Sequence, residues 1–208
     1  MSSRNVKIIV LGDTGVGKTS LLKQYVNHVF TESYKATIGM DFLVKNMSVG
    51  SQQVAVQFWD TAGQERFQSL APMMFRGADG VILTFDVTNS KSCASLEQWK
   101  DDFLIHSSPS NPENFPFIAI GNKMDRSDRE MSLAAARSFC RENGNIPYFE
   151  VSVKNDVNVD KAMTCIIENA VKNLPEEVDF SFITNPIDLR RSERVGMIYR
   201  LISKCYIL

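Results

Sequence analysis

The sequence predicts an α/β fold in which a mostly parallel, six-stranded sheet has helices on both faces. This prediction depends on three observations. Six apolar segments with strand character alternate with segments of helical spacing along the 208-residue chain. Two of these segments, residues 6–11 and 80–86, are rich in β-branched and other apolar residues, as buried parallel strands are. Hydrophobic residues make up 44% of the chain, which is enough for a packed core.

The first predicted strand, residues 6–11, leads directly into a glycine-rich turn and a helix. Residues 12–19, Gly-Asp-Thr-Gly-Val-Gly-Lys-Thr, fit the pattern G-x-x-x-x-G-K-[ST]. The glycines permit positive φ and a close backbone approach, so N–H groups and the start of the helix can bind phosphate oxygens. The motif predicts that Lys18 reaches the β- and γ-phosphates and that the Thr19 hydroxyl binds Mg²⁺. The candidate phosphate-binding residues are Gly12, Asp13, Thr14, Gly15, Val16, Gly17, Lys18, Thr19 and Ser20.

A loop and a β-hairpin are predicted next. Residues 30–39 have no clear periodicity and are long enough to form a functional loop. Gly50-Ser51 separates two alternating segments and reads as a hairpin turn. The predicted hairpin strands cover residues 41–49 and 53–59, and a short helix interrupted by Pro72 is predicted over 65–75.

The second half of the chain continues the alternation of strands and helices. Ligands of such sheets bind outside the carboxyl ends of the strands, so we expect the functional side chains to follow strand ends. The predicted strands cover residues 80–86, 115–120 and 146–151, and the predicted helices cover residues 92–106, 132–143 and 160–174.

Asn122-Lys123-Met124-Asp125 follows one of these strands and predicts guanine recognition. A carboxylate at position 125 can accept hydrogen bonds from N1–H and the 2-amino group of guanine. Adenine offers neither donor, so the carboxylate would stay unpaired, which is costly. Lys123 can lie along the purine face, and Asn122 can connect this loop to the phosphate loop.

Composition argues against several other classes of protein. The net charge is −1, so nucleic acid is not an expected partner. Cysteines at 93, 140, 165 and 205 have no metal-ligand spacing, which favours reduced thiols. The N-terminal residues lack a signal peptide, Ser2 excludes N-myristoylation, and no apolar run is long enough for a transmembrane helix.

The phosphate loop and the guanine motif together resemble the small GTPases of the Ras superfamily over residues 5–174. The resemblance implies the P-loop small-GTPase fold, with a GTP-binding domain over residues 1–174. It also implies that Gln64 positions the attacking water, that Thr37 closes on Mg²⁺ and the γ-phosphate, and that Asp60 holds the metal through water. The resemblance adds these nucleotide contacts: Phe30, Tyr34, the Gly63 amide, and Ser152-Val153-Lys154, where relatives usually have Ser-Ala-Lys.

Residues 38–42 and 59–67 resemble the Rab family in particular. That resemblance implies an effector surface formed by Ile38, Phe42, Trp59 and Met74, with Met74 at the third place of an aromatic triad. Residues 34–39, 66–70, 111–117 and 145–150 are similar to the late-endosomal (Rab-seven type) branch. The expected location is therefore the cytoplasmic face of endosomal, lysosomal or vacuolar membranes, with a cytosolic pool bound to an escort protein.

Residues 175–208 are predicted to form a C-terminal tail of the hypervariable kind. The final residues, Cys205-Tyr206-Ile207-Leu208, fit C-a-a-X with Leu last, which predicts geranylgeranylation of Cys205. One lipid is a marginal anchor, and the five basic residues and one acid from residue 190 onward supply a second signal. Residues 186–189 resemble the motif by which Rab tails dock on escort proteins. An amphipathic helix on the membrane surface is a hypothesis that depends on Val195, Ile198, Leu201 and Ile202.

The expected protein is a monomeric switch that binds GTP, GDP and Mg²⁺. Its expected partners are a GTPase-activating protein, an exchange factor, an escort protein or GDI, and effectors. Three alternatives stay open at this stage: a P-loop nucleotide kinase or ATPase, a GTP-binding scaffold with little hydrolysis, and a Rab acting at another compartment. The guanine motif argues against the first alternative, and the presence of Gln64 argues against the second.

Overall fold

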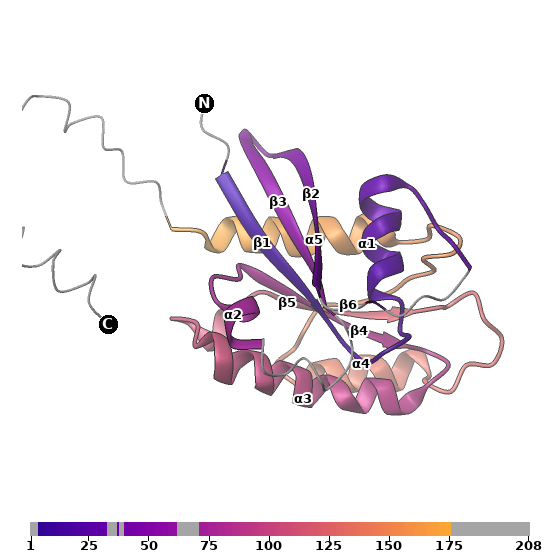
Figure 1. The fold of residues 1–208 in the computed structure, drawn as a ribbon. Helices are drawn as coiled ribbons and strands as arrows, with labels where there is room; N and C mark the ends of the chain where they lie inside the picture. The colour runs from indigo at the N-terminus through magenta and orange to yellow at the C-terminus, as the bar shows by residue number, and fades with distance from the viewer. Residues whose placement is uncertain (1–3, 33–36, 38–39, 62–70, 176–208) are drawn as a thin grey trace, which may run out of the picture. The chain divides into compact units, whose positions relative to one another are not determined.

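The computed structural model describes residues 4–32, 37, 40–61 and 71–175, which contain a six-stranded sheet and five α-helices (Figure 1). The predicted α/β class is therefore confirmed. The strands are β1 (Arg4–Leu11), β2 (Met40–Val49), β3 (Gln52–Thr61), β4 (Gly80–Asp86), β5 (Phe117–Asn122) and β6 (Tyr148–Glu150). The helices are α1 (Lys18–Asn27), α2 (Ala71–Phe75), α3 (Ser90–Ser107), α4 (Leu133–Glu142) and α5 (Val159–Asn173), with a 3₁₀ turn at Pro112–Asn114.

The strand order is β2-β3-β1-β4-β5-β6, and only the β2–β3 pair within the described residues is antiparallel. The antiparallel pair is the predicted hairpin, and Gly50 turns it with a φ of 59°. The other strands are parallel because a helix crosses over between them. The carboxyl ends of β1, β4 and β5 therefore lie at one edge of the sheet, where ligands of this architecture bind.

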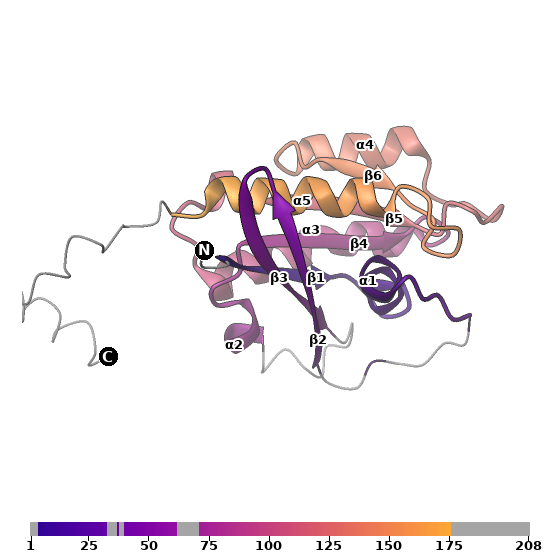
Figure 2. The same ribbon diagram turned by 90° about the horizontal axis from the view of Figure 1, so that it is seen from above.

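Figure 1 shows helices on both faces of the sheet, and a hydrophobic layer lies between the sheet and the helices of each face. Helices α1 and α5 lie on one face, and α2, α3 and α4 lie on the other. In β1, Ile8 and Val10 point into the first layer, whereas Ile9 and Leu11 point into the second. This alternation explains the continuous apolar run in the sequence, because both faces of the strand are buried. In Figure 2, α5 runs across the middle of the sheet.

Helix ends follow local capping signals in the sequence. The side chain of Asn89 accepts a hydrogen bond from the Lys91 amide at the start of α3. Ser132 accepts one from the Ala135 amide at the start of α4. These residues satisfy helix-start amides that have no partner within the helix. Helix α1 ends at Asn27 and is followed by the capping residue His28, which adopts a left-handed φ of 54°.

The strand predicted over residues 115–120 and the predicted effect of Pro72 are wrong, and several other predicted bounds differ from the structure by one or two residues. The strand predicted over residues 115–120 begins at Phe117 and continues through Asn122. Pro116 lacks the amide donor of a central strand position, which explains the late start. Pro72 was predicted to interrupt a helix, but it lies in the first turn of α2, where its missing donor costs little. The rest of that predicted helix, residues 65–70, lies outside the described residues.

Of the tail predicted over residues 175–208, residues 176–208 lie outside the described residues, so its boundary stays a prediction. None of the helices in the described part of the chain is long and apolar enough to span a membrane. Cys93, Cys140 and Cys165 are free thiols, and burial raises the pKa of Cys93 to about 11.

Candidate nucleotide site

The phosphate loop connects the end of β1 to the start of α1. Gly12, Gly15 and Gly17 adopt φ values of 139°, 82° and 102°, which side chains rarely tolerate. A Cβ on Gly12 would overlap the Thr84 carbonyl oxygen, and one on Gly17 would overlap the side-chain nitrogen Nδ2 of Asn122. The motif glycines at 12 and 17 therefore permit both the turn and its close contact with β4 and β5.

Lys18 lies beneath this loop and is only 5% exposed. Its Nζ donates hydrogen bonds to the carbonyl oxygens of Gly12, at 2.7 Å, and Asp13, at 2.9 Å. Burial lowers the pKa of Lys18 to about 8, while the Asp60 and Asp13 carboxylates oppose that shift. The ammonium group is thus held at the loop by two carbonyls, where it can also donate to phosphate oxygens.

The three predicted metal-binding residues come together beside Lys18. Thr19 Oγ1 donates to Asp60 Oδ2 at 2.5 Å and lies 2.6 Å from Thr37 Oγ1. Asp60 Oδ1 is buried without a hydrogen-bond partner, and burial raises the pKa of this carboxyl group. An unpaired buried carboxylate oxygen beside two hydroxyls fits Mg²⁺, which prefers oxygen ligands and keeps several waters. The described residues contain no group of three or more His, Cys, Asp or Glu that could hold another metal.

The Asn122–Asp125 loop is connected to the phosphate loop by Asn122. Its Nδ2 donates to the Val16 carbonyl oxygen at 2.8 Å, and its Oδ1 accepts from the Lys123 amide at 2.7 Å. Asp125 Oδ1 accepts from Ser152 Oγ at 2.6 Å. A carboxylate fixed in this way has a defined orientation, which base recognition requires.

Val153, which replaces the usual alanine, does not expose its branched side chain to the site. The side chain is 2% exposed and packs in the hydrophobic layer beneath α1 and α5. Its backbone N–H donates to Asn122 Oδ1 over a long 3.3 Å distance. The amide predicted to contact the base is therefore part of the same network as the base loop.

A cavity of about 650 Å³ joins the phosphate loop and the base loop. Phe30 lines it and packs partly against the core. Of the predicted nucleotide and metal residues that the structure describes, these line the cavity: Thr14, Gly15, Gly17, Lys18, Thr19, Ser20, Phe30, Thr37, Asn122, Lys123, Asp125, Val153 and Lys154. Gly12, Asp13, Val16, Asp60 and Ser152 support those residues through the contacts described above.

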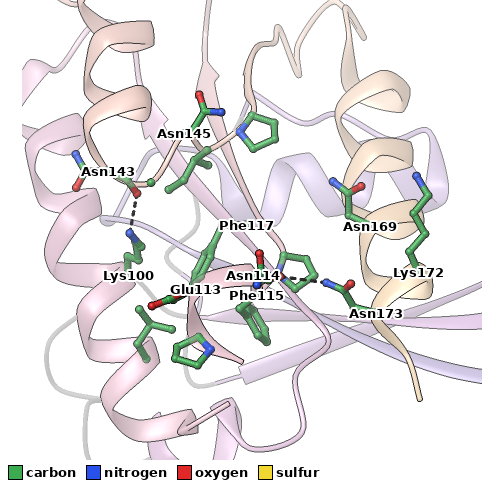
Figure 3. A pocket seen from close by; sticks show the side chains of 16 residues that line it. Lys100, Glu113, Asn114, Phe115, Phe117, Asn143, Asn145, Asn169, Lys172 and Asn173 are labelled. Carbon is green, nitrogen blue, oxygen red and sulfur yellow. Dashed lines mark hydrogen bonds between the residues drawn. The ribbon is translucent and has the colours of Figure 1, made fainter. Parts of the chain in front are cut away.

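A second hollow of about 590 Å³, drawn in Figure 3, lies at the amino ends of β5 and β6. Lys100 there donates to the Asn143 carbonyl oxygen, and Asn173 donates to the Asn114 carbonyl oxygen (Figure 3). It contains none of the predicted site residues. Because ligands of parallel sheets bind at the carboxyl ends of the strands, this hollow is not the nucleotide site.

Sequence reasoning missed three supporting side chains. Trp99 Nε1 donates to Asp13 Oδ1 at 2.8 Å, which connects α3 to the phosphate loop. Asp86 forms an ion pair with Lys123 at 2.6 Å, and Glu32 forms one with Lys154 at 2.6 Å. The position of Asp86 could have been recognised from the sequence, since Asp86 ends β4 as Asn122 ends β5. The two residues are partners in the register of these neighbouring strands. The other two contacts join distant segments and had no local signal.

Three of the residues predicted for the effector surface, Phe42, Trp59 and Met74, have described side chains. Phe42 is 59% exposed and stacks on Trp59, with ring centroids 5.9 Å apart. Met74 is 5% exposed and packs in the core with Phe75, so its predicted place on this surface is wrong. The exposed neighbour is Met73, at 81%, because one step along α2 turns a side chain about 100°. Other predicted functional residues lie outside the described residues, namely Tyr34, Ile38, Gly63, Gln64 and Cys205.

Substitution of Gly17 by Ala is expected to lower GDP affinity at least about tenfold. The left-handed φ alone costs about 1–2 kcal/mol for a residue with a Cβ, and the new Cβ would displace Asn122 from Val16. Gly15→Ala is the matched control for the clash, because its φ of 82° brings the same kind of backbone strain while no atom lies within 4 Å of its Cβ position, so it should lose less affinity than Gly17→Ala. Titration of fluorescent GDP checks the prediction, and equal affinities of the two variants would contradict it.

The comparisons with known proteins agree with this geometry. The model of the Ras family matches residues 7–173. A GTP-binding protein from Volvox carteri, yptV5, is 51% identical over 91% of this chain and 92% of its own length. The Ypt/Rab-type GTPase Rab7 from Neurospora crassa is 51% identical over 91% and 95% of the two chains. The Ras-related protein Rab7A from Mesembryanthemum crystallinum is 50% identical over 93% and 96%. The chain therefore belongs to the Ras family, is a small GTPase that hydrolyses GTP, and is similar to the Rab7/Ypt7-type members of that family.

Proposed function

We propose that this protein is a membrane-anchored switch of vesicle trafficking that cycles between GTP-bound and GDP-bound states. The observation that supports it best is the hydrogen bond from Asn122 to Val16, which unites the guanine motif and the phosphate loop around one cavity. In an adenine-specific kinase, a carboxylate fixed at position 125 would find no hydrogen-bond donor on the base. The proposal thus assigns a guanine nucleotide to this cavity.

The described side chains have distinct roles in this proposal. Lys18 binds the β- and γ-phosphates, and Thr19, Thr37 and Asp60 would hold Mg²⁺, with Asp60 acting through water. When bound, Mg²⁺ neutralises charge on the phosphates. Asp125 accepts hydrogen bonds from guanine, and Lys123, Phe30 and the Val153 amide contact the base. The remaining candidate nucleotide contacts are Gly12, Asp13, Thr14, Gly15, Val16, Gly17, Ser20, Tyr34, Gly63, Asn122, Ser152 and Lys154.

Hydrolysis supplies the switch. Gln64 orients the attacking water, while Lys18 stabilises the charge that develops on the transferred phosphoryl group. Thr37 and Gly63 are held by the γ-phosphate, so its loss releases both of their loops. The surface around Ile38, Phe42 and Trp59 is then recognised by effectors mainly in the GTP state. A GTPase-activating protein, an exchange factor and an escort protein or GDI complete the cycle.

A competition assay tests the guanine assignment. Fluorescent GDP bound to the full-length protein in Mg²⁺ should be displaced by GTP and GDP at about equal excess. ATP should fail even at about a 10³-fold higher concentration, because it cannot satisfy Asp125. Displacement by ATP at concentrations similar to those of GTP would contradict the assignment of a guanine nucleotide to this cavity.

We assign the switch to late endosomes and the lysosome or vacuole. The support is the similarity to Rab7-named relatives and the sequence agreement outside the nucleotide site. Association with the membrane is assigned to geranylgeranyl on Cys205 together with the basic residues of the tail.

Substitution of Cys205 by Ser is expected to move most of the membrane-bound protein into the cytosolic fraction, since the lipid is then lost. Fractionation of cells that express the tagged chain measures this, and Cys165→Ser in α5 is the control. Equal membrane association of the wild type and Cys205→Ser would contradict the anchoring assignment.

A further inference from the structure

One ion pair joins the two loops that flank the nucleotide cavity. Lys154 Nζ lies 2.6 Å from Glu32 Oε1, and both residues line the cavity. Glu32 belongs to the segment that follows α1, and Lys154 belongs to the turn that follows β6. Within residues 4–32 and 71–175, it is the one polar side-chain contact between this segment and that turn.

Lys154 belongs to a turn that several hydrogen bonds hold in place, whereas Glu32 belongs to a segment with fewer such contacts. Lys154 follows Ser152, whose hydroxyl bonds Asp125 and accepts from the Asn155 amide. Ser152 and Val157 also exchange two backbone hydrogen bonds, of 3.1 and 2.9 Å, which close the turn. The segment with Glu32 is held less firmly. Its described backbone contacts are two hydrogen bonds to the last turn of α1, from the His28 amide at 3.0 Å and the Val29 amide at 3.4 Å, and Phe30 packs partly on the core.

The ion pair lies at the solvent side of the cavity. Side-chain exposure is 73% for Glu32 and 52% for Lys154, whereas Val153 beneath them is buried. Residues assigned to the base are found on both sides of the pair, with Phe30 next to Glu32 and Asp125 bonded to the turn of Lys154. A contact in this place joins the edges between which a base must pass to leave.

We propose that the Glu32–Lys154 ion pair is a positioning contact that closes the outer edge of the nucleotide cavity and slows nucleotide release. The proposal rests on the assignment of a guanine nucleotide to that cavity. Glu32 acts by holding the segment after α1 against the base loop. Because exposed ion pairs are weak, loss of the pair should speed release only about two- to fivefold.

The experiment measures release of fluorescent GDP from the full-length protein into excess unlabelled GDP, with Mg²⁺ present. The variants are Glu32→Gln, Lys154→Gln and the double variant. Neutral substitutions are preferred to charge reversal because Asp125 also interacts electrostatically with Lys154. Glu168→Gln, at an exposed position of α5, is the control with the same chemical change.

Glu32→Gln should release GDP about two- to fivefold faster than the wild type, whereas Glu168→Gln should not. The effect of Glu32→Gln should disappear in the Lys154→Gln background. Added salt should speed release from the wild type toward the rate of Glu32→Gln, because salt screens exposed pairs. An unchanged rate in Glu32→Gln, or the same acceleration in both backgrounds, would overturn the proposal while guanine binding stands. Failure of the wild type to retain fluorescent GDP would instead overturn the nucleotide assignment and this proposal together.

Discussion

Asp125→Asn is expected to lower the affinity for GDP by about 10²- to 10⁴-fold and to create affinity for xanthosine diphosphate. The carboxylate is proposed to accept two hydrogen bonds from guanine, and bonds to charged groups contribute about 1.5–3 kcal/mol each. The amide of Asn can still accept from Ser152, whose hydroxyl now bonds Asp125 Oδ1. Its NH₂ group faces the base instead, where it can donate to the C2 carbonyl of xanthine.

Competition of guanosine, xanthosine and adenosine diphosphates against a fluorescent nucleotide measures this change. Asp128→Asn is the matched control. Asp128 is an exposed carboxylate three residues away that pairs with Arg126. It should keep the preference for guanine. If Asp125→Asn retained the wild-type affinity for GDP, the carboxylate would not be the residue that recognises the base.

Gln64→Leu is expected to slow GTP hydrolysis by about 10²-fold or more without loss of GTP binding. The side chain is assigned to orient the attacking water, and leucine has neither a donor nor an acceptor to do so. Gln64 lies outside the described residues, so the prediction depends on its place after Asp60-Thr61-Ala62-Gly63. Single-turnover hydrolysis, with and without an activating protein, measures the effect.

The control for Gln64 is Gln98→Leu, the same substitution at an exposed position of α3. It should hydrolyse GTP at the wild-type rate. If Gln64→Leu hydrolysed GTP at the wild-type rate both with and without an activating protein, Gln64 would not be a catalytic residue. The GTP-bound fraction in cells should rise in parallel, since release of phosphate is the step that ends the active state.

The parts of the site that could be predicted from the sequence depend on local geometry. Gly12, Gly15 and Gly17 are fixed by the backbone of one turn, so their spacing alone indicates the phosphate loop. The order of strands and helices likewise follows from short-range periodicity. The predicted contact of Asn122 with the phosphate loop is present because both segments follow strands that end at the same edge.

The remaining contacts depend on tertiary packing between distant segments, which local sequence patterns do not predict. Trp99 and Asp13 meet only because α3 packs on β4, the strand next to β1, and Glu32 meets Lys154 only because two loops converge. The family resemblance assigns Met74 to the effector surface, but the packing of α2 on the core buries Met74 and exposes Met73. Such errors arise where tertiary packing, rather than local pattern, decides which side chain is exposed.

The most direct test of the central claim is phosphate release from GTP and ATP by the purified full-length protein, with Mg²⁺ and with a chelator in excess. We predict slow release from GTP in Mg²⁺, no measurable release from ATP, and loss of activity when the metal is removed. Release from ATP at a rate like that from GTP, or release from GTP that is unaffected by the chelator, would contradict a guanine-specific, Mg²⁺-dependent GTPase.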